Sequence, residues 1–200
     1  GSEEEQDEYY QDRFYENQGD GLFSRPKGVL PIVISSGSCV KSGDFDNDGD
    51  LDLFVGGKLI PGKYPLPADS YLLRNESQGG KIKFVDATDE LAPFLKEIGM
   101  VSDAEWIDVN GDHHLDLVVV GEWMSIMIIK NTENGFVEVT ETGIENQTGW
   151  WYSIASADFD KDGDMDFIVG NLGLNYKYQA SEEEPFEVFA KDFDDSGSLD

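Results

Sequence analysis

Apolar and polar residues alternate in short runs along this chain, and Gly, Asn or Asp separates each run from the next. Three segments place two alternating runs on either side of a turn rich in Asn and Gly, at residues 13–23, 71–84 and 126–139. Alternation with a period of two, interrupted by such turn residues, predicts β-hairpins. Residues 88–99, by contrast, predict one or two helical turns that connect strands.

A second set of strands flanks strongly acidic stretches. Short alternating runs precede them at residues 38–42, 102–106 and 152–156, and hydrophobic runs that end in Gly or Asn follow them at residues 51–57, 115–121 and 165–171. One unit therefore reads strand, acidic loop, strand, variable loop, strand, Gly turn, strand. Antiparallel four-stranded units that repeat along a chain are typical of β-propeller blades.

The repeats predict an all-β protein with an incomplete propeller of about three and a half blades. The expected organisation is an acidic tail at residues 1–9, a partial blade at 10–35, blades at 36–98, 99–147 and 148–186, and a further partial blade at 187–200. Because a propeller usually needs four to eight blades to close, we expect further blades or domains in a longer parent chain. The alternatives are an open array and completion by another chain.

The charge of the chain restricts its partners. There are 42 Asp and Glu residues against 14 Lys and Arg, which gives a net charge of −28. Clustered carboxylates repel one another unless cations neutralise them. This composition favours a hard cation as a partner and argues against nucleic acid and against anionic membrane surfaces. No apolar run approaches the roughly 20 residues needed to cross a bilayer, so we expect no membrane insertion.

Oxygen-bearing side chains recur at alternate positions of four nine-residue loops. In the first loop they are Asp44, Asp46, Asp48, Asp50 and Asp52. In the second loop they are Asp108, Asn110, Asp112 and Asp116, with His114 at position 7. In the third loop they are Asp158, Asp160, Asp162, Asp164 and Asp166. In the fourth loop they are Asp192, Asp194, Ser196, Ser198 and Asp200.

Such loops fit Ca²⁺, which takes six to eight oxygen ligands. Positions 1, 3 and 5 would supply side chains, position 7 a backbone carbonyl, and position 9 a closing carboxylate. An EF-hand needs Glu at position 12, and the chain has Val55, Val119 and Val169 there. We expect two to four ions, bound most strongly by residues 44–52 and 158–166 and most weakly by residues 192–200. The alternative is that these acids are solvated turn residues.

A possible ligand face lies on the loops at the opposite ends of the strands. Its residues are aromatic with a few polar groups, which suits a sugar or a peptide. They are Lys58, Tyr64, Glu122, Trp123, Trp150, Trp151, Asn171 and Tyr176. Alternatively, these aromatic residues cap the blades and pack the loops.

The acidic loops and the Gly-ended strands after them resemble the FG-GAP/VCBS repeats of integrin-α-like propellers. Stretches such as residues 84–88, 121–124, 136–140, 148–151 and 170–175 resemble the cartilage acidic protein family and its bacterial secreted or surface-anchored relatives. The resemblance implies an extracellular or cell-surface location (the outer membrane in a bacterium) and a role in adhesion or carbohydrate recognition.

Taken together, these features predict a non-catalytic, calcium-binding recognition or adhesion module whose partner is an extracellular protein or a glycan. Two alternatives remain open. One is a polysaccharide-active enzyme, for which Asp103 and Glu105 beside a Trp would be candidate groups. The other is a purely architectural domain of a larger protein.

Overall fold

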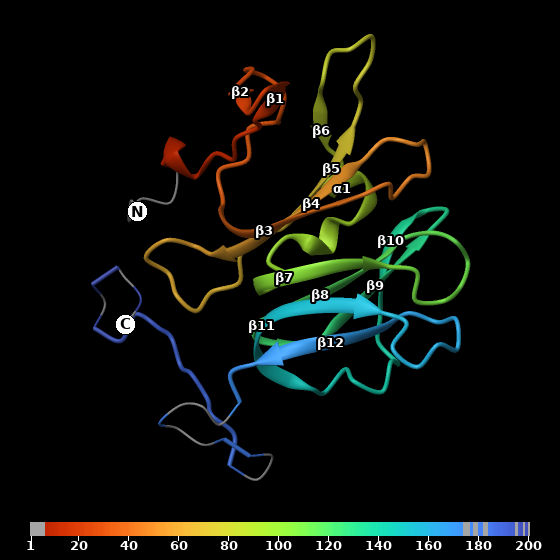
Figure 1. The fold of residues 1–200 in the computed structure, drawn as a ribbon. Coiled ribbons are helices and arrows are strands. Elements are labelled where there is room, and N and C mark those ends of the chain that lie inside the picture. The colour runs from red at the N-terminus through yellow and green to blue at the C-terminus, as the bar shows by residue number, and fades with distance from the viewer. Residues whose placement is uncertain are drawn as a thin grey trace.

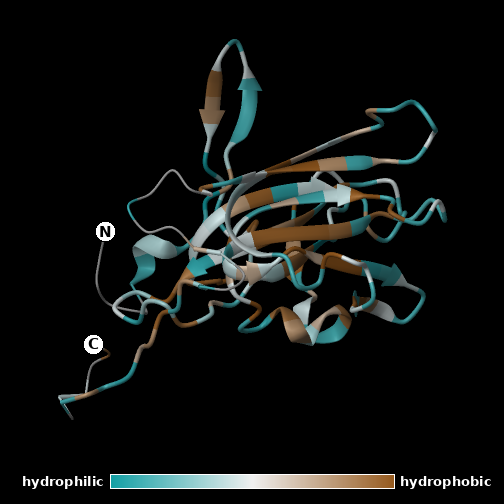
Figure 2. Cartoon of the chain, turned by 90° about the horizontal axis from the view of Figure 1, so that it is seen from below, coloured by the Kyte–Doolittle hydropathy of each residue, from teal (hydrophilic) through white to brown (hydrophobic). Residues whose placement is uncertain are grey.

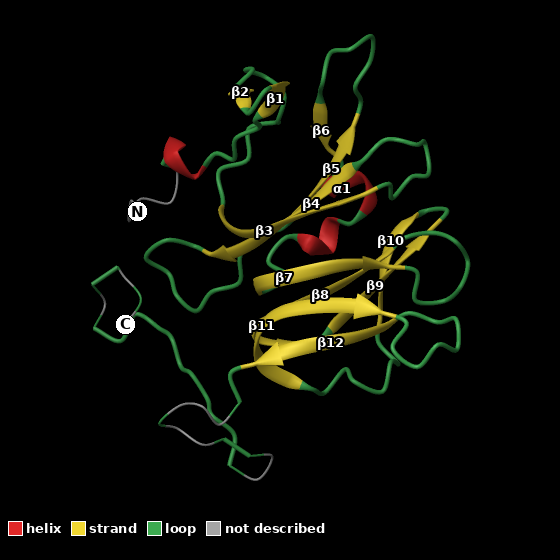
Figure 3. Cartoon of the chain, in the orientation of Figure 1, coloured by secondary structure: helices red, strands yellow, loops and turns green. Residues whose placement is uncertain are grey.

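The computed structural model describes residues 7–173, 177, 180–181, 184–194, 196–197 and 199. Within these residues the chain forms antiparallel β-sheets joined by loops and a few helical turns, as Figure 1 and Figure 3 show. The prediction of an all-β protein with the blade pattern of an incomplete propeller is confirmed. Residues 174–176 and several later positions of the expected third and last blades lie outside the described residues.

The first complete sheet has four strands in chain order. They are β3 (Ser36–Gly43), β4 (Asp52–Leu59), β5 (Tyr71–Asn75) and β6 (Phe84–Asp86). Most of β4 is buried because it lies between two partner strands and both faces are covered. After β6, α1 (Thr88–Leu91) and η2 (Pro93–Leu95) lead to the next sheet, as the short helical segment predicted.

The second sheet repeats this plan and is joined directly to the third. Its strands are β7 (Met100–Ile107), β8 (Asp116–Ser125), β9 (Met127–Thr132) and β10 (Gly135–Val139). The last residues of β8 also pair with the first residues of β11 (Thr148–Ala157), and β11 pairs with β12 (Asp166–Asn171). One long strand therefore connects two neighbouring sheets by backbone hydrogen bonds.

The N-terminal segment contributes a small separate hairpin. It consists of η1 (Glu8–Tyr10), β1 (Glu16–Gly19) and β2 (Leu22–Ser24), and Figure 2 shows the hairpin standing away from the two large sheets. The predicted strand over residues 13–17 starts later than expected, at Glu16. The turn fixes this register, because it pairs Asn17 with Phe23 and Glu16 with Ser24.

The main core lies between the first and second sheets. Phe54 and Leu72 from the first sheet meet Val101, Leu117 and Ile129 from the second, and all five side chains are buried. Figure 2 shows the apolar strands gathered in the interior. Burial of apolar side chains between sheets is the main source of stability in such a fold.

Two equivalent glycines, in the second strands of the first two sheets, allow close approach of a neighbouring backbone segment. A Cβ atom at Gly57 would lie 2.0 Å from the carbonyl oxygen of Asp69, and one at Gly121 would lie 2.2 Å from that of Met100. No side chain fits at either position, which explains why both hydrophobic runs end in Gly.

The loops lie at two opposite ends of the sheets. The acidic loops between β3 and β4, β7 and β8, and β11 and β12 lie together at the right of Figure 1, and the connection from β4 to β5 lies at the left. The first two acidic loops touch, since the Asn47 amide nitrogen and the His114 Nδ1 atom are 2.7 Å apart.

Candidate functional site

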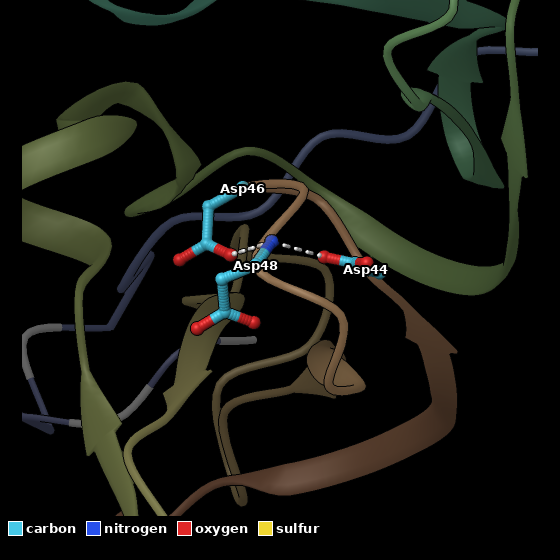
Figure 4. A group of neighbouring side chains, drawn as sticks. All are labelled: Asp44, Asp46 and Asp48. Atoms are coloured by element: carbon cyan, nitrogen blue, oxygen red, sulfur yellow. Dashed lines mark hydrogen bonds between the residues drawn. The ribbon is translucent and has the colours of Figure 1, made fainter.

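The first acidic loop is closed by its own carboxylates. The backbone N–H of Asp48 donates to Asp44 Oδ1 (3.1 Å) and to Asp46 Oδ1 (3.3 Å), and the N–H of Gly49 donates to Asp44 Oδ2 (3.0 Å). Figure 4 shows the three carboxylates turned around the backbone of Asp48. One ligand oxygen from each of Asp44, Asp46 and Asp48 lies within 4.8 Å of the others, close enough to hold one metal ion.

The same hydrogen bonds recur in the second loop. Asp108 Oδ2 accepts the N–H of His113 (2.9 Å), and Asn110 Oδ1 accepts the N–H of Asp112 (2.9 Å). The N–H of His114 then donates to Asp112 Oδ1 (3.0 Å). Positions 1, 3 and 5 therefore face inward here as well, although position 3 offers an amide oxygen instead of a carboxylate.

The third loop holds a second acidic cluster. Asp158 Oδ1 accepts the N–H of Lys161 (2.6 Å), and Asp158 Oδ2 accepts that of Gly163 (3.2 Å). Oxygens of Asp158, Asp160 and Asp166 lie within 4.8 Å of one another. Positions 1 and 3 are again included, and here position 9 belongs to the cluster.

The described part of the fourth loop follows the same pattern. The N–H of Ser196 donates to Asp192 Oδ1 (2.9 Å) and to Asp194 Oδ1 (3.1 Å), and the N–H of Gly197 donates to Asp192 Oδ2 (2.7 Å). The predicted ligands Ser198 and Asp200 lie outside the described residues.

Positive φ angles at positions 4 and 6 bend the first three loops. They occur at Asn47 (59°), Gly49 (97°), Gly111 (74°), His113 (67°), Lys161 (67°) and Gly163 (102°). The second loop therefore places its Gly at position 4 and accepts a left-handed His at position 6, which costs more than Gly would.

In the first three loops the carboxylate at position 9 accepts backbone N–H groups at the base of the loop, a role that the sequence did not predict. Asp52 is fully buried; its Oδ2 accepts the N–H of Phe45 (3.1 Å) and its Oδ1 accepts that of Asn75 (2.7 Å). The side chain of Asn75 in turn donates to the carbonyl of Leu51 (3.1 Å). Position 9 therefore ties the loop to the third strand of its sheet.

Asp116 has the corresponding role in the second sheet. It accepts the N–H groups of Val109 (3.1 Å) and Asn131 (2.7 Å). The Asn131 side chain also donates to the carbonyl of Phe45 (2.7 Å), which belongs to the first acidic loop. Asn75 and Asn131 occupy the same place in successive hairpins. Their regular spacing in the sequence is the signal that could have identified them as partners of the position-9 carboxylates.

Burial and crowding change the acidity of these groups. Burial raises the pKa of Asp52 to about 6, although two backbone N–H groups oppose the change. Burial also raises the pKa of Asp116. The pKa of Asp46 is raised by burial and by the nearby Asp48. Burial opposes ionisation of Asp108, but four backbone N–H groups outweigh it and lower its pKa.

The raised pKa of Asp52 predicts that the free energy of unfolding of the cation-free protein depends on pH. The folded pKa of Asp52, about 6, exceeds its ordinary value of 3.8, so the folded state holds this proton more tightly than the unfolded state. Protonated Asp52 therefore contributes to the free energy of unfolding. This contribution is fully present below about pH 4 and is lost as the pH rises to about 6, a change of at most about 3 kcal/mol.

Chemical denaturation of the wild type and of Asp52→Asn, in buffer without divalent cations, measures this contribution. Because Asn does not titrate, the wild type should lose stability relative to the variant as the pH rises from about 4 to 6. A constant difference between the two proteins over this range contradicts the assignment.

The donor set of the loops fits a hard cation. The first and third clusters consist of carboxylate oxygens, which are ligands that Ca²⁺ prefers. In the first loop Asp50 Oδ1 is buried and has no hydrogen-bond partner, which is costly for a carboxylate. A cation within reach would satisfy that oxygen; the oxygens that lie within 4.8 Å of one another come from Asp44, Asp46 and Asp48. The His114 side chain, by contrast, is directed to Asn47 of the first loop.

The proposed ligand-face residues meet at the opposite end of the sheets. Trp123 donates its indole N–H to the hydroxyl of Tyr64 (2.7 Å). Its ring centre lies 5.3 Å from that of Trp150 and 5.4 Å from that of Phe186, on which it stacks. Trp123 itself has a positive φ of 60°, which is rare for a bulky residue and coincides with a register shift in the pairing of β8 with β11.

Polar residues accompany this aromatic cluster. Lys58 forms an ion pair with Glu122 across the first and second sheets, and its ammonium also donates to Ser102 (2.8 Å). The indole N–H of Trp151 donates to the carbonyl of Met124 (3.2 Å). Asn171 pairs with Trp151 in the sheet, and Tyr176 lies outside the described residues.

Four-stranded antiparallel sheets with an acidic loop between their first and second strands define a class of β-propeller repeat proteins. The model of the FG-GAP-like repeat family matches residues 6–55 and 108–169, which is more than half of the chain and includes the first three acidic loops. The chain belongs to the FG-GAP-like repeat family. No curated protein matches it, so the resemblance to the cartilage acidic proteins stays a prediction. Among the described residues, no helix has the length and apolarity required to cross a bilayer.

Proposed function

We propose that the protein is a non-catalytic recognition module whose blade loops are held rigid by Ca²⁺. The observation that carries the proposal is the repeated geometry of the acidic loops. Each described loop turns the side-chain oxygens of positions 1 and 3 inward through bonds from its own backbone N–H groups, which leaves further oxygens to face a cation. The buried oxygen of Asp50 adds a group that needs such a partner.

Calcium is the ion that suits these loops. It accepts six to eight oxygens in flexible geometry, whereas Mg²⁺ requires near-ideal octahedral geometry and gives up its waters reluctantly. Asp44, Asp46, Asp48 and Asp50 would hold it in the first loop, and Asp158, Asp160 and Asp166 would hold it in the third. The ion would supply positive charge that offsets repulsion among these carboxylates. The loops would then be rigid enough to support neighbouring binding surfaces.

The family supports an extracellular or cell-surface setting, since FG-GAP repeats are typical of such proteins. Loops of this kind in extracellular modules bind Ca²⁺ with dissociation constants of about 10⁻⁴–10⁻³ M. Millimolar external calcium would fill them. The partner would be an extracellular protein or a glycan.

Calcium titration by isothermal calorimetry tests the proposal. We expect at least two ions to bind, and we expect Asp44→Asn and Asp158→Asn each to remove about one of them. Asp20→Asn, a change of the same type in the exposed β1–β2 hairpin, should leave the stoichiometry unchanged. Wild-type protein that binds no calcium at millimolar concentrations would exclude the metal sites.

An architectural role is the second candidate. It is favoured by the aromatic cluster, because Trp123 contacts Tyr64 from the first sheet, Trp150 from the third and Phe186 from the C-terminal segment. Such contacts would hold blades together without any ligand. The enzyme alternative relied on Asp103 and Glu105; in the structure both form ion pairs with Lys41 (2.9 and 3.7 Å).

A further inference from the structure

A cavity of about 400 Å³ opens between the first strands of the two large sheets, beside the first acidic loop. Its volume lies within the range of small-molecule sites in proteins. The residues that decide its chemistry come from both sheets: Lys41, Ser42, Leu51, Glu105, Trp106 and Leu115. Asp44, a predicted metal ligand, also lines the cavity, and Glu105 was a candidate group of the enzyme alternative.

Trp106 gives the cavity a fixed aromatic wall. Its indole N–H donates to the carbonyl of Lys41 (3.3 Å), and its ring lies 5.9 Å from Phe45 and 6.1 Å from Phe136. A Cβ atom at Gly43 would come within 2.8 Å of the ring, so the indole lies directly over this glycine. The ring is therefore already ordered, and a ligand would lose little affinity by immobilising it.

Opposite charges stand in the same cavity. The ammonium of Lys41 lies 2.9 Å from Asp103 Oδ1 and 3.7 Å from Glu105 Oε2, and the hydroxyl of Ser156 lies 3.5 Å from Glu105 Oε1. These contacts hold the lysine and the glutamate in place without using all their hydrogen-bonding capacity. The cavity thus offers both donors and acceptors beside apolar surface from Leu51 and Leu115.

This charge balance selects the kind of ligand. The lining carries the ammonium of Lys41 against the carboxylates of Glu105 and Asp44, and Asp44 is a proposed ligand of the loop cation. With that cation bound, Lys41 and Glu105 are left facing the cavity, so a ligand with a net charge of either sign would meet a like charge. A neutral molecule with several hydroxyl groups and one apolar face matches the cavity better. A sugar ring has these properties, since its C–H face can lie on an indole while its hydroxyls bond to a carboxylate and an ammonium.

We propose that the cavity between β3 and β7 binds one unit of a neutral saccharide. The proposal rests on the proposed recognition role and names its ligand class. Glu105 and Lys41 hold the sugar hydroxyls, Trp106 supports the ring, and Leu51 covers one side. This site borders the first acidic loop through Asp44 and Leu51, and it shares no residue with the cluster of Trp123, Tyr64 and Trp150.

Titration with neutral oligosaccharides tests the site. The probes are the tetrasaccharides of cellulose, xylan, starch, mannan and chitin, added to the whole chain in millimolar CaCl₂ and followed by calorimetry and saturation-transfer NMR. We expect at least one probe to bind, and we expect Glu105→Gln to weaken it about tenfold or more, because a charge-assisted hydrogen bond is lost. The fold should survive this change, since the ion pair lost is partly exposed.

Leu51 supplies a matched control. Leu51→Lys places a long side chain at the cavity and should abolish binding, whereas Met165→Lys makes the same change at the same position of the third loop, outside the cavity. Both leucine and methionine are exposed, so both variants should melt like the wild type.

Three results would overturn the proposal: no probe binds at about 10 mM, both cavity variants bind like the wild type, or arginine methyl ester binds more tightly than every oligosaccharide. The calcium titration separates this site from the metal sites. Calcium binding without saccharide binding would contradict the proposed saccharide site alone. Saccharide binding without calcium binding would contradict the proposed metal sites alone.

Discussion

Calcium at about 10 mM should raise the melting temperature of the protein by about 10–20 °C, and the same concentration of magnesium should raise it far less. This concentration is a hundredfold excess over a dissociation constant of about 10⁻⁴ M, at which each ion stabilises the folded state by about 2.7 kcal/mol. Two filled loops then add about 5 kcal/mol, and each kcal/mol shifts the midpoint of a chain of this size by about 2–4 °C. Differential scanning calorimetry with CaCl₂, MgCl₂ or EDTA measures the shift.

Loop variants connect that shift to particular sites. Asp44→Asn should remove about half of the calcium-dependent shift, and Asp44→Asn combined with Asp158→Asn should remove most of it. Both residues also accept backbone N–H groups, so the comparison is made between melts with and without calcium for each variant. Equal shifts with calcium and magnesium, or a full calcium shift in the double variant, contradict the assignment.

Asp116→Ala should lower stability by about 3–5 kcal/mol, even without calcium. The carboxylate is fully buried and accepts the backbone N–H groups of Val109 and Asn131. Truncation leaves these buried donors without a partner in a space that the small Ala side chain cannot fill. Urea denaturation in EDTA measures the loss.

Two further variants show whether the lost hydrogen bonds to Asp116 cause the loss of stability. Asp116→Asn keeps one acceptor oxygen, so it should be less harmful than Asp116→Ala. Asp164→Ala removes an exposed carboxylate from the third loop and should change stability in EDTA by less than about 0.5 kcal/mol. If Asp116→Ala is as mild as Asp164→Ala, Asp116 does not hold the loop.

The strands of the two large sheets could be predicted because their signals are local. Alternating residues and Gly turns place β5 and β9 within a residue or two of their observed bounds. The acidic loops could also be predicted, because their oxygen-bearing residues recur at alternate positions of one short stretch. The N-terminal hairpin was misplaced, since its turn and not its hydrophobic pattern sets where β1 begins. The second strand of the hairpin predicted at residues 71–84 also lies later than expected, at Phe84–Asp86.

The contacts between sheets could not be predicted, because they join residues far apart in the chain. Spacing within one loop does not show that Asp52 accepts the N–H of Asn75, 23 residues later. Nor does this spacing show that the Trp106 ring packs over Gly43 and forms the wall of a cavity. These features depend on how one sheet is set against the next, which a single sequence does not encode in any short pattern.

The pairing of β8 with β11 has a consequence for the order in which the chain assembles. Thr148 and Gly149 pair with Ser125 and Met124, at the far end of a strand that the second sheet must already have placed. The third sheet therefore gains its first strand by extension of an existing edge, and does not need an independent nucleus. Repeat proteins that grow in this way fold by propagation from one unit to its neighbour, so damage to β8 should stall every unit that follows it.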